Sequence, residues 1–161
     1  MRKIMLVDET VLSDVLINGG TDAQLMKKMQ SVRLGDGTEY LLHGQKLYAV
    51  ASTQIMHPVI ITPSDLSLEV EPTYFEFIKA LDKSKKYHPC KHELTLALCE
   101  APLVEELPIA MWPFVFNDGS ETSYFFYIKK NKGQNILDHE AMRKDAKISL
   151  EREFVAIEWA V

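Results

Sequence analysis

The chain has 161 residues, of which 47% are apolar and 25% are charged, and its formal net charge is −5. This composition predicts a single globular domain over residues 1–161, and the acidic balance argues against a general nucleic-acid coat protein, which needs net positive charge. The 2 cysteines are too few for a disulfide framework. So few cysteines favour a reducing compartment, and no apolar stretch approaches the roughly 20 residues that span a bilayer. We therefore expect a cytoplasmic protein without a membrane segment.

The N-terminal part of the chain predicts one strand followed by two helices. The apolar run at residues 4–7 predicts the strand. Asp8 or Thr10 is expected to cap the first helix, because the apolar residues after them recur with helical spacing. These residues are Val11, Leu12, Val15 and Leu16. Thr21 is expected to cap a second helix that runs through Met29.

From Val32 onward the pattern favours strands rich in Tyr, Val and Ile. The turn signal Gly35-Asp36-Gly37 predicts a hairpin, and residues 46–52 and 59–62 predict two further strands. The clearest helix of the chain follows these strands in the sequence.

This helix begins after Thr73, which forms a capping box with Glu76. Its apolar residues share one face. They are Tyr74, Phe77, Ile78 and Leu81. The helix should end near Tyr87, because Pro89 disfavours helical geometry in the residue before it.

The C-terminal part of the chain predicts mostly strands. Residues 92–99 alternate weakly and favour a strand, and residues 114–116 and 124–128 predict the two strands of an aromatic hairpin. Both faces of the second of these strands are apolar, which predicts a central strand covered on both sides or a face that meets a partner. Residues 138–147 predict a short helix, and residues 148–161 predict a final strand.

The predicted strands fall in consecutive hairpins and do not alternate with helices, which disfavours a parallel doubly wound fold. We therefore predict an α+β protein. Its core should be a mainly antiparallel, twisted sheet built from hairpins, with three or four short helices packed on it.

The most chemically suggestive residues are His88, Cys90 and His92, which would share one face of an extended segment. Imidazoles and thiolates bind soft divalent metals, and a thiol nucleophile needs a base beside it. The outer two residues of such a strand are about 13 Å apart, so all three reach one metal only if the chain bends at Pro89. A further ligand would have to come from elsewhere in the fold, from Cys99, His57 or His139. We therefore expect Cys90 to be a packing residue, with no bound metal and no cofactor.

Three lysines, Lys79, Lys83 and Lys86, recur with helical spacing on the side of the clearest helix that its apolar residues leave free; we call them the lysine face. With His88 and His92 they predict an electropositive, pH-sensitive binding surface. A solvated helix face is the simpler interpretation, because cations are favoured near a helix C-terminus.

No catalytic motif and no catalytic residue stands out. The sequence lacks a dinucleotide-binding glycine pattern, a phosphate-binding loop, a serine-nucleophile elbow and a zinc-protease motif. The second half is rich in aromatic residues, which are typical of interfaces. We therefore predict a small intracellular, non-enzymatic protein of the inhibitor or adaptor type that binds another protein. Two alternatives stay open: a metal-dependent or phosphate-substrate enzyme using the His88, Cys90 and His92 region, and weak nucleic-acid binding through the lysine face.

Overall fold

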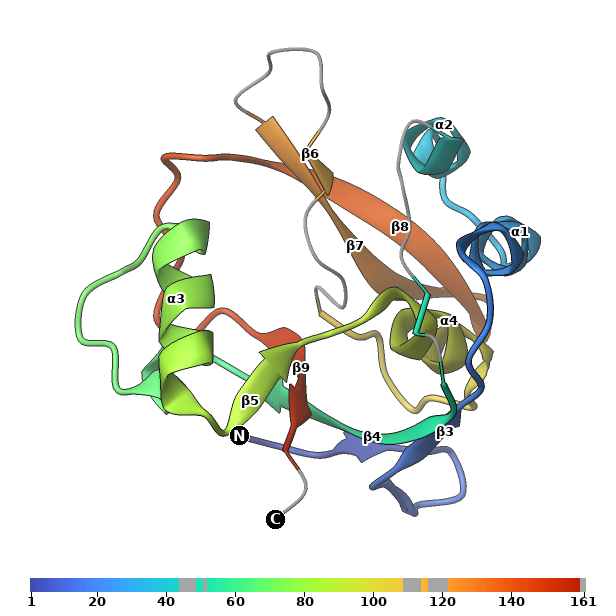
Figure 1. Cartoon of the computed structure of the whole chain (residues 1–161), viewed down its shortest axis with the longest axis horizontal. Helices are drawn as coiled ribbons and strands as arrows, with labels where there is room; N and C mark the ends of the chain where they lie inside the picture. The colour runs from blue at the N-terminus through green and yellow to red at the C-terminus, as the bar shows by residue number, and fades with distance from the viewer. Residues whose placement is uncertain (44–48, 51, 109–113, 116–121, 160–161) are drawn as a thin grey trace.

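The computed structural model describes residues 1–43, 49–50, 52–108, 114–115 and 122–159 (Figure 1). Within these ranges the chain forms three antiparallel sheets and four α-helices, which confirms the predicted α+β class. In the same part of the chain, no helix has the length and apolar character needed to cross a membrane.

One sheet has four strands in the order β3-β4-β9-β5, and every neighbouring pair is antiparallel. Its members are β3 (Val15–Ile17), β4 (Gln54–Ile61), β9 (Phe154–Glu158) and β5 (Tyr87–Pro89). The strand expected at residues 59–62 is thus part of a longer strand, and the C-terminal strand is shorter than expected. The short strands β3 and β5 form the two edges of this sheet.

A second sheet is built on a long hairpin of β7 (Thr122–Asn131) and β8 (Gln134–Arg143), with β6 (Phe114–Val115) on the other side of β7. The turn at Lys132-Gly133 has positive φ at both residues, 52° and 79°, which is the geometry of a tight two-residue hairpin. The aromatic hairpin is confirmed. The helix expected at residues 138–147 is wrong, because β8 pairs with β7 along its whole length.

Two helices begin where their capping residues predict. Thr21 caps α1 (Asp22–Ser31), and Thr73 caps α3 (Tyr74–Ser84). In both, the threonine hydroxyl accepts a hydrogen bond from the amide three residues later, and the side chain of that residue accepts one from the threonine amide. These reciprocal bonds satisfy amide groups that a helix start otherwise leaves unpaired.

Two other helices occupy residues that were expected to be strands. α4 (His92–Glu100) replaces the strand expected at residues 92–99, because this helix is buried on most of its surface and so shows no polar face. Its buried leucines alternate along the sequence as in a strand: Leu94, Leu96 and Leu98. α2 (Thr38–His43) follows the glycine turn in place of a hairpin strand, and the strand expected at residues 46–52 lies largely outside the described residues. A short 3-10 helix, η1, covers Pro63–Leu66.

The helix expected after Asp8 or Thr10 is also wrong. Asp8 stabilises a turn instead, since its carboxylate accepts hydrogen bonds from both the amide and the hydroxyl of Thr10. This turn joins β1 (Ile4–Met5) to β2 (Val11–Leu12), which form a two-stranded sheet. Residues 15–17 then form the edge strand β3.

Two hydrophobic clusters stabilise the fold. The first core lies beneath α1 and α4, and the second core lies beneath α3, at the other end of the molecule in Figure 1. β7 contributes to both, because Phe126 packs in the first core and Phe125 in the second. The strand with two apolar faces is therefore a core strand, as one of the two interpretations predicted.

Candidate functional site

The structure separates His88, Cys90 and His92. His88 lies in β5, where its ring centroid is 3.5 Å from that of Trp159, and His92 is the first residue of α4. Cys90 lies between them, buried against the first core. Because the segment changes from strand to helix here, the three side chains do not share one face. Among the described residues, no group of three or more His, Cys, Asp or Glu side chains is placed to hold a metal ion.

Burial also decides the charge of the two histidines. Burial, with help from the nearby charge of Lys91, lowers the pKa of His92 to about 4. The same two causes lower the pKa of the half-buried His88. Both rings are therefore neutral at neutral pH, and they do not strengthen the positive potential of the lysine face.

The lysine face itself is exposed on α3 and just beyond its end. His88 is half-buried in the neighbouring strand, and His92 is buried in another helix. Of the five predicted binding residues, only Lys79 and Lys83 are exposed on the helix itself. Lys86 lies beyond the helix end, after the left-handed residue Lys85, and its ammonium group lies 5.3 Å from the centroid of the Tyr87 ring. The expectation that all three lysines share one helix face is therefore wrong for Lys86, and His92 lies apart from them. The lysine face remains a prediction as a binding site, because a solvated helix face has the same appearance.

Both cysteine thiols are expected to be poorly reactive in the folded protein. Burial raises the pKa of Cys90 and of Cys99 to about 12, so almost no thiolate is present at neutral pH. A colorimetric thiol reagent should label Cys90 only as fast as the protein unfolds, because this residue is 2% exposed, whereas the half-buried Cys99 should react slowly in the folded protein. Fast labelling of native Cys90 would instead favour the enzyme alternative, in which this thiol acts as a nucleophile.

Thr38, His139 and Asp138 form a group that resembles a catalytic triad in composition alone. The Thr38 hydroxyl lies 2.8 Å from Nδ1 of His139, and the nearest Asp138 oxygen lies 3.5 Å from that same nitrogen. A relay needs the two partners on different ring nitrogens, and its nucleophile must reach substrate. Thr38 is fully buried, so the group holds α2 against β8 and has no catalytic geometry.

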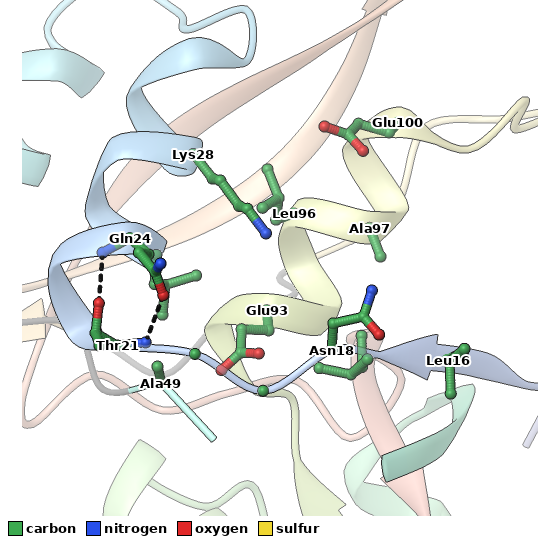
Figure 2. Close-up of a pocket in the computed structure, with 14 residues that line it drawn as sticks. Leu16, Asn18, Thr21, Gln24, Lys28, Ala49, Glu93, Leu96, Ala97 and Glu100 are labelled. Atoms are coloured by element: carbon green, nitrogen blue, oxygen red, sulfur yellow. Dashed lines mark hydrogen bonds between the residues drawn. The ribbon is translucent and has the colours of Figure 1, made fainter. Parts of the chain in front are cut away.

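A pocket of about 260 Å³ opens between α1, α4 and the segment that joins β3 to α1 (Figure 2). Gly19 and Gly20 line it from that segment, and Leu25 and Leu96 line it from the two helices. The Gly20 amide donates to the Val50 carbonyl at 3.1 Å, which fixes the wall of the pocket. The capping box of α1 fixes the next turn of the chain, as the two dashed bonds in Figure 2 show.

Three charged side chains line this pocket. Glu93, at the start of α4, is only 9% exposed, whereas Lys28 and Glu100 are exposed near its mouth. The Val50 amide donates a hydrogen bond to one oxygen of the Glu93 carboxylate. Among the described residues, neither Glu93 nor Lys28 forms an ion pair, although Figure 2 shows Lys28 reaching from α1 toward α4.

A carboxylate that is only 9% exposed and has no cation within ion-pair distance among the described residues is costly in a folded protein, so Glu93 is a candidate for binding a positively charged ligand group. Sequence reasoning did not find this pocket. Its residues come from three separated stretches of the chain, and Glu93 lies in a segment that was expected to be a strand. The only local signal was Gly19-Gly20 ahead of a helix cap, which is ordinary turn chemistry.

Beside the pocket, large apolar side chains are exposed along the N-terminal strands. Leu16 of β3 and Ile55 of β4 lie directly opposite each other and are 62% and 60% exposed. Met5 and Val11 form a second such pair across β1 and β2, and the Val104 amide donates to the Met5 carbonyl at 3.2 Å. We call the exposed residues of this region the apolar edge: Met5, Val7, Val11, Leu16, Ile55 and Val104.

The apolar edge holds 6 of the 11 large apolar side chains that are exposed in the described part of the chain. Single exposed apolar residues are common on protein surfaces, but a gathering of them marks an interaction surface. Trp112 and Phe116, two of the aromatic residues that favoured an interface, lie outside the described residues.

Comparison of the chain with protein-family models, with curated proteins and with solved structures found no match.

Proposed function

We propose that this chain is a non-enzymatic binding protein that acts in the cytoplasm and contacts its partner protein through the apolar edge. The observation that carries the proposal is the paired exposure of Leu16 and Ile55 on an edge ladder of the main sheet. Edge strands are usually shortened, charged or covered. β3 is short, yet the ladder presents two aliphatic side chains to solvent on the same face.

The chemistry of the described residues also supports a binding role over an enzymatic one. The Cys90 thiol is buried, and the group of Thr38, His139 and Asp138 lacks relay geometry. Exposed apolar residues, in contrast, make up the apolar edge. The two free cysteines fit a reducing compartment, which is the reason for placing the protein in the cytoplasm. The apolar edge favours a partner with an apolar contact surface. Because the chain has a net charge of −5, we expect basic residues around that surface of the partner.

The test is a double substitution, Leu16→Glu with Ile55→Glu, in protein used to capture partners from host extract. The matched control is Val70→Glu with Phe75→Glu, which adds the same charge at two other exposed apolar residues. A partner identified with the wild-type protein should lose affinity about 30-fold or more for the edge variant and keep it for the control. Calorimetric titration with the purified partner gives both values.

Equal affinities for the wild-type protein and the edge variant would overturn the proposal. Loss of binding in the control alone would move the contact to α3 and the lysine face. If the captured partner is a second copy of this chain, sedimentation should show a dimer that the edge variant converts to monomers.

A further inference from the structure

The pocket between α1 and α4 contains opposite charges that do not neutralise each other. Glu93 presents a carboxylate from the wall near the start of α4, and Lys28 presents an ammonium group from α1 (Figure 2). In the described part of the chain, the Glu93 carboxylate has one hydrogen-bond donor, the Val50 amide, and the Lys28 ammonium group has no carboxylate within ion-pair distance. Each charge is therefore available to a ligand of opposite charge.

We propose that this pocket binds a free amino acid, with the α-ammonium group on Glu93 and the α-carboxylate on Lys28. A zwitterion is the smallest common ligand that satisfies both charges at once. Hydrogen bonds between ionised partners are the strongest polar contacts that a site offers, and they gain strength where water is partly excluded, as it is around Glu93. A volume of about 260 Å³ accommodates a molecule of this size.

Glu100 sets the expected preference among amino acids. It lies on α4 at the opposite end from Glu93, as Figure 2 shows. The charged groups that line the pocket are therefore two carboxylates and one ammonium group. A basic side chain is therefore favoured over a neutral one, and an acidic side chain is disfavoured. The ligand class is a basic amino acid.

The inference does not depend on the proposed function. Leu16 belongs both to the lining of the pocket and to the apolar edge, so the two sites are neighbours. Glu93 and Lys28, however, are not part of the apolar edge. Substitutions at these two residues test the pocket, and substitutions at Leu16 and Ile55 test the contact with a partner protein.

The experiment is a calorimetric titration of the purified chain with four probes. L-lysine is the proposed ligand type, cadaverine is the same molecule without its carboxylate, ε-aminocaproate is the same molecule without its α-ammonium group, and L-glutamate has the wrong side-chain charge. We expect L-lysine to bind most tightly and each of the other three to bind about tenfold more weakly or worse.

Two variants assign each ligand group to its residue. Glu93→Gln keeps an acceptor for the Val50 amide and should remove the preference for L-lysine over ε-aminocaproate. Lys28→Met should remove the preference for L-lysine over cadaverine. Lys27→Met, an exposed neighbour on α1 that does not line the pocket, should leave all affinities unchanged.

Thermal unfolding confirms that each variant is folded, and if Glu93→Gln does not fold, the Lys28→Met comparison decides alone. The proposal is overturned if none of the probes binds at millimolar concentration. It is also overturned if L-lysine binds a folded variant with its wild-type preferences intact.

Discussion

Replacing Phe125 with alanine is expected to lower the free energy of unfolding by about 3–5 kcal/mol. Phe125 is fully buried in the second core, where its ring meets that of Tyr74 edge-on at a centroid distance of 4.7 Å. Truncation removes apolar contacts from β7, leaves a cavity beneath α3, and abolishes a favourable aromatic pair. The neighbouring Phe126 fills the other core and holds β7 in place, so the cavity has little scope to collapse.

Phe75→Ala is the matched control, because Phe75 lies on α3 but is 57% exposed. This change should alter stability by about 0.5 kcal/mol or less. Urea denaturation, followed by far-ultraviolet circular dichroism, measures both variants. Similar losses for the two substitutions would show that Phe125 is not packed between β7 and α3 as described.

The second large effect is a loss of stability at mildly acidic pH that depends on His92. The folded-state pKa of His92 is about 4, below its ordinary value of 6.5, because the ring is buried. As pH falls below 6.5, the unfolded chain binds a proton that the folded protein excludes, so stability decreases until the pH reaches about 4. At about 1.36 kcal/mol for each pH unit, the loss between pH 6.5 and pH 5 is about 2 kcal/mol.

The readout is the slope of stability against pH, compared between the wild-type protein and His92→Gln. The variant should lose most of this slope, whatever its stability at neutral pH. His88→Gln should change the slope less, because His88 is only half-buried. An unchanged slope in His92→Gln would mean that the His92 ring titrates normally in the folded protein.

The elements that were predicted correctly are those whose sequence patterns lie within a few neighbouring residues. The capping boxes at Thr21 and Thr73 locate α1 and α3, because both hydrogen bonds of each box join residues that are only three positions apart. The aromatic hairpin and the C-terminal strand follow from β-branched and aromatic residues close together in the chain. Cys90, expected to pack in the interior, is indeed buried.

The elements that were wrong depend on contacts between distant segments. α4 has no polar face because the first core surrounds it, so its leucines alternate as in a strand. Residues 11–17 have helical spacing, but Asp8 turns the chain and β4 supplies a partner for β3. β8 is a strand because β7 pairs with all of it, and that partner is not visible in the spacing of residues 138–147.

The binding residues were harder to predict than the fold. The pocket unites Asn18, Lys28, Glu93 and Glu100, which have no common spacing or motif, and nothing local shows that Glu93 is buried. Leu16 was assigned to the apolar face of a helix, so its exposure on an edge strand was not expected. Burial and edge position follow only from the assembled sheet.

Amide hydrogen exchange, measured on the protein with and without its purified partner, tests the central claim most directly. If the partner binds at the apolar edge, protection should appear in β3 and in the part of β4 that pairs with it, residues 54–56. The amides of α3, which carries most of the lysine face, should exchange at the same rate in both samples. Protection confined to α3, with β3 and β4 unchanged, would contradict this account.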